Sequence, residues 1–237
     1  MTIGRVVIQI TTPTELTDVL WEGMLEPPVV TRSDHSLRAS IGRPAQWSDG
    51  QVLGDKWQPP LGGGRYYLLR LAFSLRPSER SRASISAADF CLRLHAQAGQ
   101  QAVVFDAYPQ EQLVEQDRSV TLGIGPAFKL GTVDVEVAKA ETTIDFGRAI
   151  PVIHSDGLAE AAFCWRYSVH RRQPLTGSRL MYAIVHLPAG MARSLATMEL
   201  AVTTQDALGP ILLSPPERDL SKLRWMVGEG PTSPAAG

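Results

Sequence analysis

The sequence predicts a mainly β protein, an antiparallel β-sandwich of roughly eight to ten strands with short N- and C-terminal helices. Two observations lead to this fold class. From residue 65 onward, apolar residues recur at every second position in short runs separated by turn residues, as in strands with one buried and one exposed face. None of these runs is followed by a long amphipathic helix, which argues against a parallel α/β sheet.

The alternating runs assign an inward face to each expected strand. Their apolar members are Tyr67, Leu69, Leu71, Phe73 and Leu75; Phe90, Leu92 and Leu94; Val103 and Phe105; Val120, Leu122 and Ile124; Val133, Val135 and Val137; Phe163, Trp165, Tyr167 and Val169; Leu180, Tyr182 and Ile184; and Met198, Leu200 and Val202. The run that contains Trp165 is the most aromatic, so we expect Trp165 to lie buried between the two sheets.

The pattern divides the chain into three parts. Residues 1–64 lack the alternation and are expected to be an irregular N-terminal embellishment, with a long Pro-, Gly- and Ser-rich connection from residue 26 onward. Residues 65–228 carry the sandwich, and residues 229–237 are expected to be a disordered tail.

Two capping boxes predict the short helices. Thr12 and Glu15 flank Pro13, which suits the first position of a helix, and this predicts a helix over residues 13–22. Ser214 and Glu217 form a second capping box, which predicts a helix that ends at Gly228.

The composition argues against several classes of function. The net charge of −1 gives no overall field that would gather nucleic acid. No apolar run approaches the roughly 20 residues that a membrane-spanning helix needs, and the N-terminus resembles a strand rather than a signal peptide. With only Cys91 and Cys164 present, we expect two free thiols on the outer side of their strands and a cytoplasmic protein.

Candidate catalytic residues have simpler structural interpretations. His154, Ser155 and Asp156 are adjacent in sequence, but a catalytic triad is a spatial arrangement, and a turn at Asp156–Gly157 explains them. Cys91 and His95 share one strand face about 13 Å apart, too far for a dyad. The Gly-x-Gly in residues 123–131 precedes a strand, whereas a phosphate loop precedes a helix. We therefore expect no cofactor and no metal site.

Four loop arginines are the predicted binding residues: Arg80, Arg82, Arg171 and Arg172. They favour a non-enzymatic binding or scaffold module that recognises a protein partner through sandwich loops. Two alternatives remain open. One is a hydrolase with a dispersed Ser/His/Asp site near His154. The other is a pore-forming protein that inserts residues 119–146 as a β-hairpin, since such hairpins show the same alternation.

Overall fold

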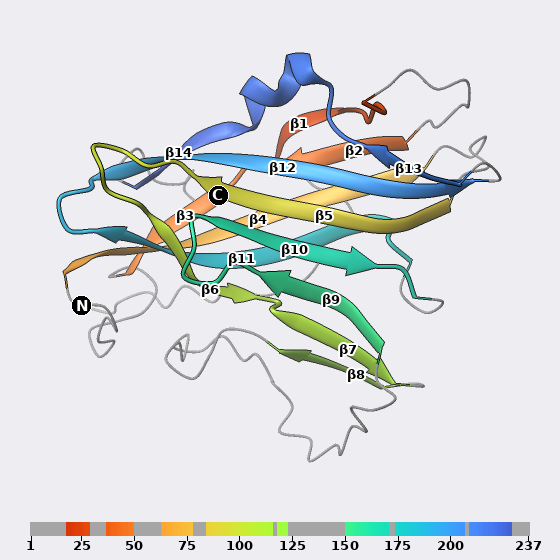
Figure 1. The fold of residues 1–237 in the computed structure, drawn as a ribbon, viewed down its shortest axis with the longest axis horizontal. Coiled ribbons are helices and arrows are strands. Elements are labelled where there is room, and N and C mark those ends of the chain that lie inside the picture. The colour runs from red at the N-terminus through yellow and green to blue at the C-terminus, as the bar shows by residue number, and fades with distance from the viewer. Residues whose placement is uncertain are drawn as a thin grey trace, which may run out of the picture.

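The structure, a computed structural model, describes residues 18–28, 37–49, 63–77, 84–115, 118–122, 150–170, 174–206 and 209–228. Two antiparallel sheets lie face to face (Figure 1). The six-stranded sheet has the order β1 (Val19–Met24), β2 (Leu37–Gly42), β4 (Gly64–Pro77), β11 (Gly177–Pro188) and β6 (Val103–Tyr108), and β3 (Ala45–Ser48) pairs with β4.

The eight-stranded sheet runs β13 (Gly209–Leu213), β12 (Arg193–Asp206), β5 (Ser84–Leu94), β10 (Ala162–Ser168), β9 (Ile150–Asp156), β7 (Glu111–Glu115) and β8 (Arg118–Leu122). Strand β14 (Arg224–Gly228) also pairs with β12. The predicted β-sandwich is confirmed, with more strands than expected. In the described part of the chain, no helix is both long and apolar enough to span a membrane.

The core fills the space between the sheets, and most of the predicted inward faces are correct. Trp165 is fully buried, as predicted, and so are Phe90 on β5 and Phe73 on β4. Phe73 stacks on Phe90 with ring centroids 5.5 Å apart, so the two sheets meet at this contact. The inward faces of β5, β10 and β12 follow the alternation because their other face carries mainly polar or smaller residues. The inward face of β4 also follows it, although Tyr66 and Leu68 on its other face are buried as well.

The inward faces of β11 and β6 were predicted the wrong way round. On β11, Met181, Ala183, Val185 and Leu187 belong to the core, whereas Tyr182 and Ile184 face outward. There they join Tyr66 and Leu68 in a second apolar cluster on the outer face of the six-stranded sheet. Val104, not Val103 or Phe105, is the core residue of β6. Both faces of β11 are apolar, so alternation alone does not fix its phase.

Both predicted helices need correction, although residues 13–17 of the first lie outside the described residues. Residues 19–24 form strand β1, paired with β2, and the buried Trp21 belongs to the core. A short apolar run fits helical spacing and a strand equally well, and pairing with β2 decides the outcome. At the other end, a 3₁₀ helix, η1 (Glu217–Leu223), begins after Pro216 without a side-chain cap, and Arg224–Gly228 is strand β14.

The predicted irregular connection also changes. Strands β2 and β3 lie between residues 26 and 64, and both pair with β4 in the sandwich. The two strands are only six and four residues long, so they show little regular alternation, and pairing with β4 supplies their backbone partners. The predicted tail at 229–237 lies outside the described residues.

Cys91 and Cys164 form a disulfide, so the prediction of two free thiols is wrong. The two residues are direct partners in the antiparallel pairing of β5 with β10, with their Cα atoms 4.1 Å apart. Both are half-buried and alternate out of phase with the core residues Phe90 and Trp165, as predicted. The expected cytoplasmic location, which rested on two free thiols, loses that support and remains a prediction.

The side chain of His186 lies in surroundings that disfavour its charged form. It lies on the outer face of β11, is 8% exposed, and stacks against Tyr66 at 4.7 Å. Its Nε2 atom is buried without a hydrogen-bond partner. Burial lowers the pKa of His186 below its ordinary 6.5, although a hydrogen bond with the Gly63 backbone opposes this shift.

We expect the free energy of unfolding to fall as the pH drops below about 6.5. In that range His186 binds a proton more readily in the unfolded chain than in the folded chain, so protonation favours unfolding. Urea unfolding at pH 7.5 and 5.5 measures this loss of free energy of unfolding. The loss should be smaller in His186→Gln. It should be unchanged in the control His154→Gln, because His154 is exposed in the wild type. An equal loss in the wild type and His186→Gln would contradict the assignment.

Candidate binding site

The four predicted binding residues, Arg80, Arg82, Arg171 and Arg172, lie outside the described residues. The structure therefore does not test them, and they remain predictions. The predicted pore hairpin, residues 119–146, also lies outside, apart from its first residues in β8.

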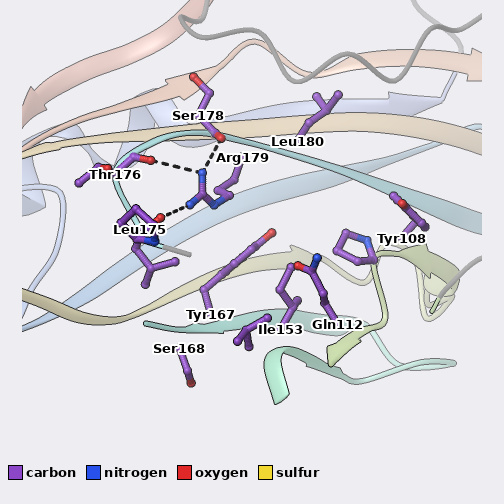
Figure 2. A pocket seen from close by; sticks show the side chains of 13 residues that line it. Tyr108, Gln112, Ile153, Tyr167, Ser168, Leu175, Thr176, Ser178, Arg179 and Leu180 are labelled. Carbon is purple, nitrogen blue, oxygen red and sulfur yellow. Dashed lines mark hydrogen bonds between the residues drawn. The ribbon is translucent and has the colours of Figure 1, made fainter. Parts of the chain in front are cut away.

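A pocket of about 460 Å³ opens between the two sheets, near the point where the chain crosses from β6 to β7. It is bordered by β6, β7, β9, β10, the start of β11 and the segment Pro174–Thr176 that precedes β11 (Figure 2). Its apolar lining includes Val152, Ile153 and Leu175, all of them buried. A volume of this size lies in the lower part of the range typical of ligand pockets.

Arg179 supplies the positive charge of this pocket. Its guanidinium donates through Nη1 to the carbonyl oxygens of Thr176 (3.3 Å) and Ser178 (2.9 Å), and through Nη2 to that of Pro174. These acceptors all belong to one short segment of chain, so they fix the orientation of the guanidinium. Among the described residues, no carboxylate forms an ion pair with it.

The environment of Arg179 is unusual for a cation. Burial lowers the pKa of Arg179, and the neighbouring Tyr167 partly opposes this shift. A guanidinium nevertheless stays charged in proteins. The half-buried charge has backbone dipoles as its described partners but no anion, and this arrangement favours an anionic ligand.

Tyr167 on β10 brings a hydroxyl group to the same pocket. The residue is 2% exposed, and its ring packs edge-on against Phe73 in the core at 5.3 Å. Its side chain points from β10 toward Arg179 (Figure 2). No hydrogen bond joins the hydroxyl to any described residue. Burial raises the pKa of Tyr167, so the group remains a neutral hydroxyl that can donate a hydrogen bond.

Two more polar side chains line the opposite side of the pocket. Gln112 on β7 is half-buried, and Tyr108 lies at the end of β6 (Figure 2). Burial raises the pKa of Tyr108 and keeps it neutral. The described lining residues include no His, Cys, Asp or Glu, so they offer no general base or thiol nucleophile. The arrangement can bind a ligand with an anionic end and an apolar body.

The Ser/His/Asp set near His154 does not form a triad. All three residues lie in β9, not in a loop, so Ser155 points away from the face that carries His154 and Asp156. The Ser155 hydroxyl donates to the Gln110 carbonyl oxygen at 2.9 Å, and Asp156 pairs with Arg166 at 2.9 Å.

The predicted bend at Gly157 is confirmed. Gly157 has a φ of +93°, and a Cβ atom there would lie 2.0 Å from the carbonyl oxygen of Ala162, so only glycine fits this turn. Among the described residues, no three His, Cys, Asp or Glu side chains lie together in a way that could hold a metal ion.

Sequence reasoning missed Arg179 because it assigned the wrong phase to β11. With Leu180, Tyr182 and Ile184 taken as inward, Arg179 fell on the exposed face. The structure places Arg179 in phase with the core residues Met181 and Ala183. A charged residue on the inward face of a strand is the signal that would have indicated the pocket.

Comparisons with known proteins add only distant likenesses. No protein-family model matches the chain, and no curated protein matches it in sequence. A solved structure described as a pore forming protein has a TM-score of 0.35 and 9% identity, and the match covers 77% of this chain and 89% of that chain. Clostridium perfringens delta-toxin has a TM-score of 0.31 and 9% identity, with 79% and 83% covered.

The collagen binding subdomain of Enterococcus faecalis surface protein ACE has a TM-score of 0.27 and 10% identity, and the match covers 65% of this chain and 88% of that chain. At these TM-scores the likenesses carry no argument about function.

Proposed function

We propose that the protein is a non-enzymatic binding module that recognises a protein partner by taking an acidic group into the pocket at Arg179. The observation that carries this proposal is the half-buried guanidinium, fixed by three backbone carbonyls and facing the Tyr167 hydroxyl without a described carboxylate partner. Because the carbonyls already hold the guanidinium in place, a ligand does not have to order it on binding.

The position of the pocket supports recognition through a loop. The segment Pro174–Thr176 forms one wall and belongs to the connection between β10 and β11. Arg171 and Arg172 precede it in the sequence and belong to the same connection. The predicted cationic residues Arg171 and Arg172 are therefore close in sequence to one wall of the pocket.

The test uses a library of short peptides in which the acidic group is an internal Asp or Glu or a free C-terminus. We expect wild type to bind a subset, and Arg179→Gln to bind that subset about 30-fold more weakly or worse. Removing one partner of a buried charge pair costs about 2 kcal/mol or more. Arg224→Gln on the exposed surface of β14 is the matched control and should bind as wild type does.

A separate variant distinguishes lost binding from lost folding. Tyr167→Phe removes one hydroxyl without a described partner and keeps the ring that packs on Phe73. It should weaken binding and leave the melting temperature unchanged or slightly higher. Failure of the wild type to bind any acidic peptide, or full binding by Arg179→Gln, would overturn the proposal.

A second candidate function is membrane insertion through the 119–146 hairpin, and one feature of the topology favours it. Strands β8 and β9 both pair with β7, so residues 123–149, which connect them, start and finish at strands that flank β7. Leu122 ends β8 opposite Glu111 and Ile150 begins β9 opposite Val114, so the ends of the insertion lie about 14 Å apart, two strands across and three residues along β7. An insertion anchored in this way can leave the sheet while the other strand pairings remain. Its sequence alternates Val133, Val135 and Val137 with charged residues.

Dye release from lipid vesicles tests this candidate. Insertion predicts that wild type releases the dye and that Val135→Asp releases much less, because a charge on a lipid-facing strand opposes insertion. Arg179→Gln is the control, since the pocket plays no part in insertion. If the wild type released no dye at any concentration, the pore-forming function would be ruled out and the binding function would remain.

A further inference from the structure

We infer that the acidic group that enters the Arg179 pocket is the free C-terminal carboxylate of a protein chain that ends in an apolar residue. This inference rests on the proposed function, because it names the ligand class of the same pocket. Three features of the pocket lead to it: the donors left on Arg179 and Tyr167, the amide of Gln112, and the apolar wall.

The first feature is a set of donors suited to a carboxylate. A guanidinium has five N–H donors. Three of them on Arg179 bind the carbonyls of Pro174, Thr176 and Ser178, which leaves the Nε–H and one Nη2–H without an acceptor among the described residues. Both of these N–H groups are available to a carboxylate ligand.

Tyr167 adds a donor from the other sheet. Its hydroxyl is held at the pocket by a ring that is buried in the core, and it points toward Arg179 (Figure 2). The hydroxyl opens on the pocket and has no hydrogen-bond partner among the described residues, so it is free to donate to a ligand oxygen. Arg179 and Tyr167 together offer donors to both oxygens of a carboxylate.

The second feature is the Gln112 side chain. In a C-terminal residue, the peptide group that precedes the carboxylate is attached to the same α-carbon. When the carboxylate is bound, that peptide group therefore lies close enough for a neighbouring side chain of the pocket to contact it. An amide such as Gln112 can both donate to and accept from a peptide group. Gln112 lies across the pocket from Thr176 (Figure 2), and no described residue forms a hydrogen bond with its side chain.

The third feature is the apolar wall of Val152, Ile153 and Leu175. The α-carbon of a C-terminal residue carries its side chain next to the carboxylate, so an apolar side chain would contact this wall once the carboxylate is bound. An internal Asp or Glu brings only methylene groups to the same place. The apolar contact therefore favours a chain terminus over an acidic side chain.

The test compares three small probes by titration calorimetry: N-acetyl-Gly-Leu with a free carboxylate, the same compound as its C-terminal amide, and N-acetyl-Asp-Leu as its C-terminal amide. We expect the free acid to bind wild type at least tenfold more tightly than either amide. Tyr167→Phe should weaken binding of the free acid about tenfold, with an unchanged melting temperature. Tyr67→Phe, a buried tyrosine that does not line the pocket, is the matched control and should bind normally.

The outcomes separate this inference from the proposed function. Equal binding of the free acid and its amide, or tighter binding of the Asp compound, would overturn the C-terminal inference and leave the acidic-group proposal standing. Absence of binding by all three probes, together with no binding in the peptide library, would overturn both. Binding of the free acid that Arg179→Gln and Tyr167→Phe leave unchanged would place the ligand elsewhere and also overturn both.

Discussion

Replacing Trp165 with Ala is expected to lower the free energy of unfolding by about 3–5 kcal/mol. The Trp165 side chain is fully buried and packs edge-on against Phe163, with ring centroids 4.7 Å apart, and close to Phe90. Its removal leaves a cavity between two paired sheets, whose backbones are fixed by hydrogen bonds and cannot close the space. Urea unfolding followed by far-UV circular dichroism measures the loss.

Trp165→Phe is the matched control for this prediction. It keeps an aromatic ring in the core and removes an indole N–H that is buried without a hydrogen-bond partner. Its loss of stability should therefore be clearly smaller than that of Trp165→Ala. If the Ala variant unfolded within about 1 kcal/mol of wild type, Trp165 would not be the packing centre that its contacts indicate.

The alternation in the sequence predicted the core where a strand has one apolar and one polar face. Trp165 on β10 and Phe90 on β5 are such cases, because their sequence neighbours are charged, small or half-exposed. The same rule failed on β11, where Tyr182 and Ile184 are buried on the outer face and Met181 and Val185 on the inner face. Burial of both faces removes the contrast on which the rule depends.

That failure concealed the candidate site. The phase of β11 decides whether Arg179 points into the sandwich or out to solvent, and the phase was set by packing against β4 and β6 rather than by local sequence. Tyr167 was correctly placed in the core, but nothing in its own strand indicates that its hydroxyl opens on a pocket. The pocket needs the β10–β11 connection and the β6–β7 crossing together, and these are distant in sequence.

The disulfide could not be predicted for a related reason. The sequence showed that Cys91 and Cys164 lie on outward phases of their strands, and this is correct. Whether the two strands are neighbours, and in which register, depends on the order of strands in the sheet. A shift of one residue would have placed Cys164 opposite Phe90 or Leu92 instead of Cys91.

The bond between Cys91 and Cys164 is expected to contribute about 4 kcal/mol to the free energy of unfolding. It joins residues 73 positions apart, so it closes a long loop and restricts the unfolded chain strongly. Both residues are half-buried on the outer face of their sheet, so replacing them with Ala disturbs the core little. The double variant Cys91→Ala/Cys164→Ala should therefore retain the fold and unfold at a lower urea concentration.

Reduction of the wild type provides the control for that loss. Dithiothreitol should lower the unfolding midpoint of wild type toward that of the double variant and leave the double variant unchanged. Alkylation of the denatured protein followed by mass spectrometry checks the bond itself. Without reductant no cysteine should be modified, and after reduction both cysteines should be modified. Two alkylated cysteines before reduction would contradict the bond. An unchanged midpoint on reduction would show that strand pairing, and not the cross-link, holds β5 beside β10.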